Sequence, residues 1–321
     1  MNGSAGCYNA IVIGQNRSQK CSGSRSEAAI SQLSSYGIDI RSGIKDGGTS
    51  TQSISIDHTT ITHVGGYGID VSTNVTGGST SFTQNVKLTD VTAKAGGPSG
   101  VLFTGNASSG AALKQILSID PTTISGSYYG LQVSADATAG AHLNQSVDIS
   151  DVTASGALSA IYVYGSAGSN GVLHQSVSLD HVDAADAIVG VSLIGVAHNH
   201  GKVFQNFDIH DLSAHDNLID GLTIYGLAAE AGRGSALLAQ YITVENSSFT
   251  DNGGLGGDIY LVADGPGAAG LQQIEVSNSA FSGNLVGLGL GETAINSAAA
   301  QQNALLTNDS LTDNFYVGGA F

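Results

Sequence analysis

The sequence has few positively charged residues and no long apolar run. Of its 321 residues, ten are Lys or Arg and 26 are Asp or Glu, so the formal net charge is −16. Nucleic-acid binding relies on basic stripes that neutralise phosphates, and this composition therefore predicts no nucleic-acid partner. A transmembrane helix needs about 20 apolar residues in succession, which no segment here provides. We expect no membrane insertion by this segment.

Cysteine is also scarce. The two cysteines, Cys7 and Cys21, both fall in the N-terminal segment, where a disulfide between them would indicate an oxidising compartment. The alternative is a pair of free thiols. The chain does not open with a charged segment followed by an apolar one, as a secretory signal does. We predict the disulfide and an extracellular or cell-surface location, with a leader that is not part of this chain.

Proline is rare and tryptophan is missing, whereas glycine is abundant. The chain contains 3 Pro, no Trp and 45 Gly, and 41% of its residues are hydrophobic. A disordered chain lacks that much apolar content, so the composition predicts a folded, turn-rich β protein. Apolar residues alternate at period 2 in short runs such as Val147-Asp-Ile149 and Val177-Ser-Leu179. This is the pattern of strands that bury one face.

The strands recur at a fixed interval. Gln145-Ser-Val-Asp-Ile is followed 30 residues later by Gln175-Ser-Val-Ser-Leu, and again by Gln205-Asn-Phe-Asp-Ile. Such a period predicts a solenoid whose rungs stack in parallel, about 4.8 Å apart. We expect the glutamines and the Asp or Asn residues of the corners to form hydrogen-bonding ladders along the stack. Nine repeats begin at Gln52, Gln84, Gln115, Gln145, Gln175, Gln205, Gln240, Gln272 and Gln302.

This pattern resembles the right-handed parallel β-helix superfamily, which includes pectate-lyase-like enzymes and autotransporter passengers. The resemblance implies an all-β, right-handed parallel β-helix (solenoid) of about ten rungs, with roughly 30 residues per rung. Residues 1–30 are expected to form an N-terminal cap or leader, with a short helix near residues 26–33. Residues 31–321 are expected to form a single parallel β-helix domain.

Uniform rungs of this length are most similar to passenger and adhesin repeats. The resemblance implies an extracellular structural or interaction protein that binds a cell-surface or polysaccharide partner, or associates with itself. Uncovered rung ends expose unpaired strand edges, so self-association through these ends would give a homo-oligomer. This role requires no cofactor.

The alternative is a polysaccharide-active β-helix enzyme. Stacking places Asp180, His210 and Glu245 in one outward column, and Asp208 lies on the same strand as His210. Two neighbouring carboxylates suit a glycoside hydrolase, in which one acts as acid and the other as base or nucleophile. A lyase or epimerase would need basic residues beside this face, and the sequence has few. The motifs that mark β-helix polygalacturonases are missing, so we favour the non-enzymatic role.

Two further surface sites are predicted on the third strands of the repeats. Gln132, Tyr162 and Tyr260 are expected to point outward in one column, where the tyrosine rings offer a stacking surface to sugars. Gly253-Gly-Leu-Gly-Gly-Asp258 matches the calcium-binding nonapeptide, so Asp258 is the candidate metal ligand and calcium the candidate cofactor. The simpler alternatives are tyrosines that are merely exposed on strands, and glycines required at a tight corner.

Overall fold

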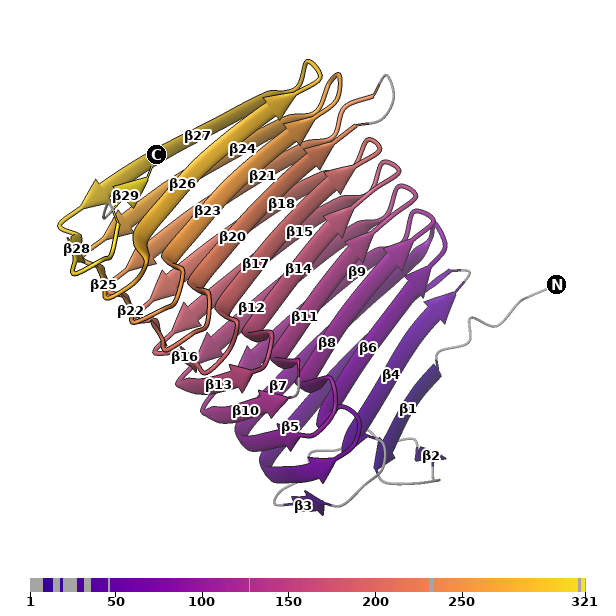
Figure 1. Cartoon of the computed structure of the whole chain (residues 1–321). Coiled ribbons are helices and arrows are strands. Elements are labelled where there is room, and N and C mark those ends of the chain that lie inside the picture. Colours follow the sequence, from indigo (N-terminus) through magenta and orange to yellow (C-terminus); the bar gives the residue numbers. More distant parts are fainter. Residues whose placement is uncertain are drawn as a thin grey trace.

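In the computed structural model, the repeats form a parallel β-solenoid of about nine turns with about 31 residues per turn (Figure 1). The all-β solenoid prediction is confirmed, with about nine turns where about ten were expected. No helix occurs among the residues that the structure describes. The predicted disulfide between Cys7 and Cys21 lies outside those residues, which are 8–13, 18–19, 28–31, 36–45, 47–126, 128–230, 234–316 and 319–320.

The third strands of the turns form a 12-stranded sheet, the front layer of Figure 1. Apart from the antiparallel β1 and β2 at its edge, its strands run parallel, and in these parallel strands successive side chains point alternately to the interior and to the surface. In spatial order the strands are β2 (Ser18–Gln19), β1 (Tyr8–Ile13), β4 (Ile38–Lys45), β6 (Ile69–Thr76), β8 (Ser99–Ser108), β11 (Tyr129–Ala137), β14 (Ser159–Ala167), β17 (Val189–His198), β20 (Asp220–Ala229), β23 (Leu255–Asp264), β26 (Val286–Ile295) and β29 (Gly319–Ala320).

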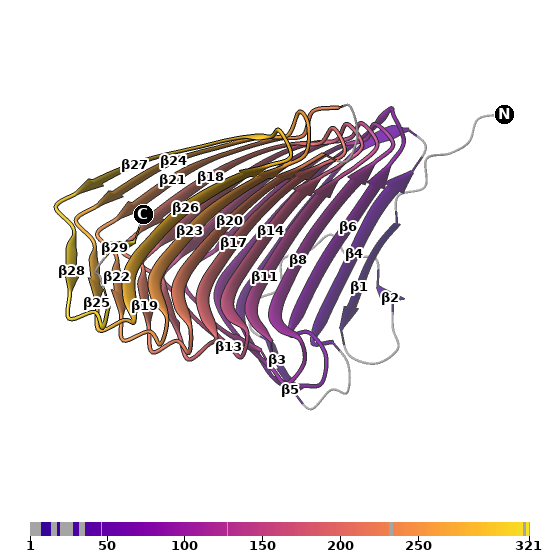
Figure 2. The same cartoon turned by 45° about the horizontal axis from the view of Figure 1, so that its top comes forward.

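The first and second strands of the turns form a 17-stranded sheet, which bends at the corner between them (Figure 2). Its first strands are β9 (Ala112–Ile119), β12 (His142–Ser150), β15 (Val172–Asp180), β18 (Lys202–His210), β21 (Leu237–Glu245), β24 (Ala269–Ser277) and β27 (Ala299–Thr307). Its second strands are β3 (Ala28–Ser31), β10 (Thr122–Gly126), β13 (Val152–Gly156), β16 (Asp183–Ala185), β19 (Ser213–His215), β22 (Ser248–Thr250), β25 (Ala280–Ser282) and β28 (Ser310–Thr312). Two long strands span both positions, namely β5 (Gly48–Val64) and β7 (Thr80–Ala95).

Equivalent residues of successive turns lie beside one another. Val147 pairs with Val177, and Val177 with Phe207, as the 30-residue period predicts. All three side chains are at most 1% exposed. Burying such a side chain contributes about 1.5–3 kcal/mol, so a column that continues through the stack supplies much of the fold's stability.

The glutamine ladder that the sequence predicts runs through the interior. Each glutamine from Gln84 to Gln302 donates from Nε2 to Oε1 of the glutamine one turn earlier, over distances of 2.6 to 3.1 Å. Most of the amides also donate to a carbonyl of the 12-stranded sheet; Gln205, for example, donates to the Ile194 carbonyl at 3.1 Å. The ladder therefore ties successive turns together and also ties the two sheets to each other.

The corners also carry stacked polar residues. At the second corner Asn217 donates to Asn252 and Asn252 to Asn284, both at 3.0 Å, and Asn284 donates to Asn314 at 3.3 Å. At the first corner the chain adopts a left-handed conformation, with φ between 44° and 59°. Asp, Asn and His accept this conformation more readily than other side chains. They occupy it at His58, Asp90, Asp151, His181, Asp211, Asn246, Asn278 and Asn308.

The two ends of the solenoid differ. At the N-terminal end, β1 pairs antiparallel with β4 and so covers the edge of the 12-stranded sheet. The helix predicted near residues 26–33 is wrong over Ala28–Ser31, which form β3, because Ile30 pairs with Ile61 in the second-strand stack. At the other end, the last described turn leaves Leu305 58% exposed and Phe315 78% exposed.

Candidate functional site

The four residues predicted to be catalytic meet on the outer face of the first strands. Asp180, His210 and Glu245 are direct neighbours in three successive turns. The His210 ring lies 2.8 Å from Asp208 through Nε2 and 3.3 Å from Glu245 through Nδ1. The structure thus confirms the predicted column, and it shows that His210 bridges the two carboxylates between which a substrate bond would have to lie.

Three other histidines repeat this arrangement along the same side of the solenoid. In each, one ring nitrogen faces a carboxylate of its own turn and the other faces a carboxylate of an adjacent turn. An imidazolium donates from both nitrogens and would satisfy both partners. The groups are His58 with Asp57 at 3.0 Å and Asp90 at 3.4 Å, His181 with Asp180 at 2.9 Å and Asp211 at 3.8 Å, and His215 with Asp216 at 2.8 Å and Asp183 at 3.0 Å.

The electrostatic effect of these groups is clearest at His215. Its hydrogen bond to Asp216 raises its pKa above the ordinary value, with a further contribution from Asp183, while partial burial acts in the opposite direction. The side chains are a third to two thirds exposed. Solvent therefore screens each pair, which contributes about 1 kcal/mol or less.

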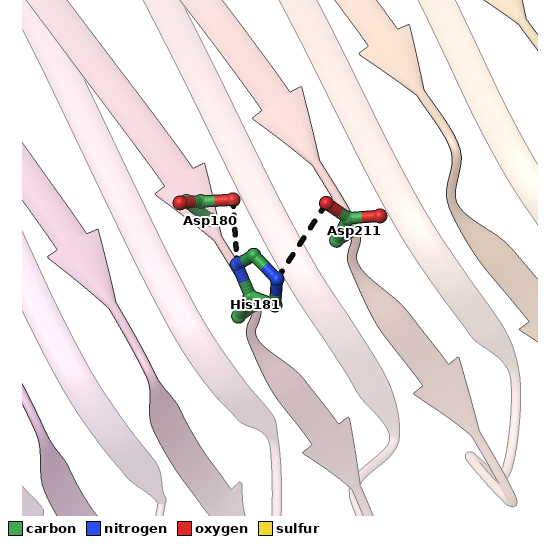
Figure 3. A group of neighbouring side chains, drawn as sticks. All are labelled: Asp180, His181 and Asp211. Carbon is green, nitrogen blue, oxygen red and sulfur yellow. Dashed lines mark ion pairs between the residues drawn. The ribbon is translucent and has the colours of Figure 1, made fainter.

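Asp180, His181 and Asp211 form the group whose donor set suits a metal ion (Figure 3). One imidazole nitrogen and two carboxylate oxygens lie within 4.8 Å of one another, and zinc accepts both kinds of ligand. The side chains stand on an exposed corner, where both contacts of His181 are ion pairs with the two aspartates. These two contacts account for the arrangement without an ion.

The residues predicted to bind sugars lie on the outer face of the 12-stranded sheet but not in one column. Gln132 and Tyr162 are neighbours in successive turns. The residue that continues their column is Asp258, whereas Tyr260 pairs with Tyr225 in the next column. The predicted position of Tyr260 is thus wrong by two residues, because the buried Ile259 pairs with Ile224 and sets the register of β23.

Asp258, the predicted calcium ligand, lies half-buried beside Asp220. Burial raises the pKa of both carboxyls, and repulsion from Asp220 adds to the rise at Asp258. Asp220 is 8% exposed and accepts hydrogen bonds from the Leu255 amide at 2.9 Å and the Thr223 hydroxyl at 3.2 Å. A divalent cation between the two carboxylates would relieve their repulsion, so the residues fit the predicted ligand chemistry.

The structure adds a surface that the sequence reasoning missed. A trough of about 350 Å³ follows the outer face of the first strands, on both sides of the buried glutamines. The rings of His174 and Phe204 stack along one side, with centroids 4.8 Å apart, and Ser146 and Ser176 leave space beside them. Tyr241, which is 45% exposed, lines both this trough and the next depression, of about 310 Å³.

The signal for this trough is present in the sequence. The residues directly before and after each glutamine must point outward because the glutamine points inward. They include two aromatic rings, a histidine and several small or amide side chains. The predicted outward columns began three residues after each glutamine and therefore left these positions out.

The part of the chain that the structure describes includes no helix long and apolar enough to cross a membrane. Comparison with known proteins found no match among family models, curated protein sequences or solved structures. The parallel β-solenoid is therefore assigned from the strand pairing of this chain itself.

Proposed function

We propose that this chain is the rod of an extracellular or cell-surface interaction protein, adhesin- or passenger-like, which binds an extended polysaccharide along its first-strand face. The observation that carries the proposal is the trough that continues past Tyr241 over several turns. A linear glycan repeats along its length, as the solenoid does, so each turn can present a similar set of contacts to successive sugars.

The chemistry of the trough favours a carbohydrate. Sugar rings combine apolar faces with hydroxyl groups, and aromatic side chains beside small polar ones suit both. Here the stacked rings of His174 and Phe204 lie in the column before the glutamines. Ser146, Ser176 and the exposed ring of Tyr241 lie in the column after them. The net charge of −16 supports a neutral glycan over a polyanionic one, because a polyanion would be repelled.

Isothermal titration with a panel of soluble neutral and acidic polysaccharides tests this proposal. We expect binding to a neutral polymer that weakens about 2- to 12-fold in Tyr241→Ala, given the about 0.5–1.5 kcal/mol of a stacked aromatic contact. Tyr162→Ala is the matched control. It removes a tyrosine of the opposite sheet that the sequence predicts to stack on sugars, but it leaves the trough unchanged. Equal affinity for wild type and Tyr241→Ala would refute the trough as the binding site.

Glycoside hydrolysis is the second candidate, and the meeting of Asp208, His210, Glu245 and Asp180 favours it. In this mechanism one carboxylate protonates the leaving oxygen and the other activates water or attacks the sugar. His210 would have to turn away to release both. Incubation with the same polysaccharides, followed by an assay for reducing ends, decides the question. Release that disappears in Asp208→Asn would establish an enzyme, and no release from any polymer would leave the binding role.

A further inference from the structure

Over four successive turns the outer face of the 12-stranded sheet is mostly apolar: three columns of outward residues hold twelve positions, of which eight are aromatic or aliphatic and four are polar, namely Ser166, Ser192, Thr223 and Asp258. We define the apolar face as the outward residues of β14, β17, β20 and β23 that are aromatic or aliphatic. In the next turn toward the N-terminus the corresponding positions carry Gln132, Ser134 and Asp136, so the patch ends sharply there. The residues of the apolar face are Tyr162, Tyr164, Ile194, Val196, Tyr225, Leu227, Tyr260 and Val262.

No element that the structure describes lies over this face in either view of the molecule (Figures 1 and 2). It is flanked at the second corner by further apolar side chains that are well exposed. Leu158 is 39% exposed, Leu218 70%, Ile219 46% and Leu285 40%. The largest apolar patch of a soluble protein, typically about 300–600 Å², often marks a contact with another molecule, and this face is of that kind.

The tyrosines of this face pack against one another between neighbouring turns. The rings of Tyr225 and Tyr260 are stacked, with centroids 6.5 Å apart and planes 9° from parallel, and Tyr129 lies 4.8 Å from Tyr162. Burial raises the pKa of the Tyr162 and Tyr225 hydroxyls. These partly buried, mutually packed rings add aromatic surface to the apolar face, and aromatic residues are enriched at the contacts between protein subunits.

The charge distribution favours a partner that contacts the 12-stranded sheet and not the acidic 17-stranded sheet. None of the twelve outward positions in the three columns over β14, β17, β20 and β23 is Lys or Arg. Asp258 is the single acidic residue among them. The paired rows of carboxylates and histidines lie on the 17-stranded sheet and its corner. Two copies joined through the apolar face would keep these acidic rows apart.

The size of the face agrees with this partner. Four strands about 4.8 Å apart and three outward positions about 7 Å apart cover about 400 Å², and the eight apolar positions make up about two thirds of this area. The exposed leucines and isoleucine at the adjoining corner enlarge the face toward the roughly 800 Å² per partner that a stable dimer buries. We propose that the apolar face binds the same face of a second copy of this chain, as a sheet-on-sheet dimer. This goes beyond the proposed carbohydrate role and leaves the trough exposed on both copies.

Sedimentation equilibrium of the full chain between about 1 and 100 µM tests the dimer, without any glycan present. We expect a species of twice the chain mass of 32.2 kDa. Ile194→Lys places two charges in the contact and should raise the dissociation constant at least about 30-fold. Ile116→Lys is the matched control, because Ile116 is an outward residue of β9 on the opposite sheet and its substitution should leave the dimer intact.

Far-UV circular dichroism and the urea midpoint of each variant establish that it is folded, and Leu227→Lys provides a second disruption of the same face. The proposal is overturned by a wild-type protein that stays monomeric at 100 µM. It is also overturned by a dimer that both Ile194→Lys and Leu227→Lys leave unchanged while folded. That second result would point instead to pairing through the solenoid ends.

Discussion

Replacing one glutamine in the middle of the ladder tests whether the buried amides hold the turns together. Gln175 is 2% exposed; it donates to Gln145 at 2.8 Å and accepts from Gln205 at 2.7 Å. Leucine has a similar size but no polar group, so Gln175→Leu leaves the Gln145 oxygen without this donor and one Gln205 hydrogen without this acceptor. Each unsatisfied buried group costs about 1–3 kcal/mol. The added apolar contact returns about 1–2 kcal/mol.

With the middle values of these ranges, the net loss in the free energy of unfolding is about 2.5 kcal/mol. Gln302→Leu is the informative comparison, because Gln302 stands at the end of the ladder and is partly exposed. Its amide donates to one glutamine, Gln272, and to the Ile259 and Gly291 carbonyls, but no glutamine of a following turn donates to it among the described residues. Gln302→Leu should cost about 1 kcal/mol or less. Urea unfolding followed by far-UV circular dichroism measures both, with the exposed Ser176→Ala as a neutral control. A Gln175→Leu protein within 0.5 kcal/mol of wild type, or equal to Gln302→Leu, would refute the reasoning.

Three further predictions follow from close contacts and pKa shifts. A methyl group on Gly195 would lie 2.0 Å from the Gln205 amide oxygen, so Gly195→Ala should lower the unfolding free energy by about 1–3 kcal/mol in the same urea assay. Because the folded-state pKa of His215 is raised, its ion pairs stabilise the protein fully below about pH 6.5 and are lost as the pH rises through the raised value. His215→Gln should flatten the dependence of the urea midpoint on pH in this range, and an unchanged slope would contradict the assignment. The pKa of Asp258 is also raised, so its ionisation destabilises the fold as the pH rises above about 4. Asp258→Asn should raise the thermal midpoint at pH 7.5 but not at pH 3.5, and calcium, if it binds beside Asp220, should stabilise wild type and not the variant.

The sequence predicts the solenoid well because its stabilising contacts are between equivalent residues. A buried glutamine every 30 to 35 residues gives the turn length, and period-2 alternation shows which side chains are internal. These two signals were sufficient for the Val147, Val177 and Phe207 column and for the amide ladder. They also placed Asp180, His210 and Glu245 side by side.

Features that depend on irregular spacing were not predicted. Tyr260 was placed in the wrong column because the loops before it change length, and only the packing of Ile259 against its neighbours fixes the register there. Ala28–Ser31 has the composition of a helix, yet the adjacent Ile61 strand makes it extended. The pairing of each surface histidine with two carboxylates also depends on side-chain directions that the repeat period does not encode.

Spin-label distances along one outward column test the central claim, the stacking of the glutamine-led strands, most directly. Ser53, Ser176, Asn206 and Gln273 share the column one residue after the glutamines, with the last three residues four, five and seven turns from Ser53. With Cys7 and Cys21 changed to Ser, double electron–electron resonance on labelled pairs diluted in unlabelled protein should give distances that rise by about 5 Å per turn. The account expects about 19, 24 and 34 Å before the label arms are added. Distances that do not increase in this order would contradict it.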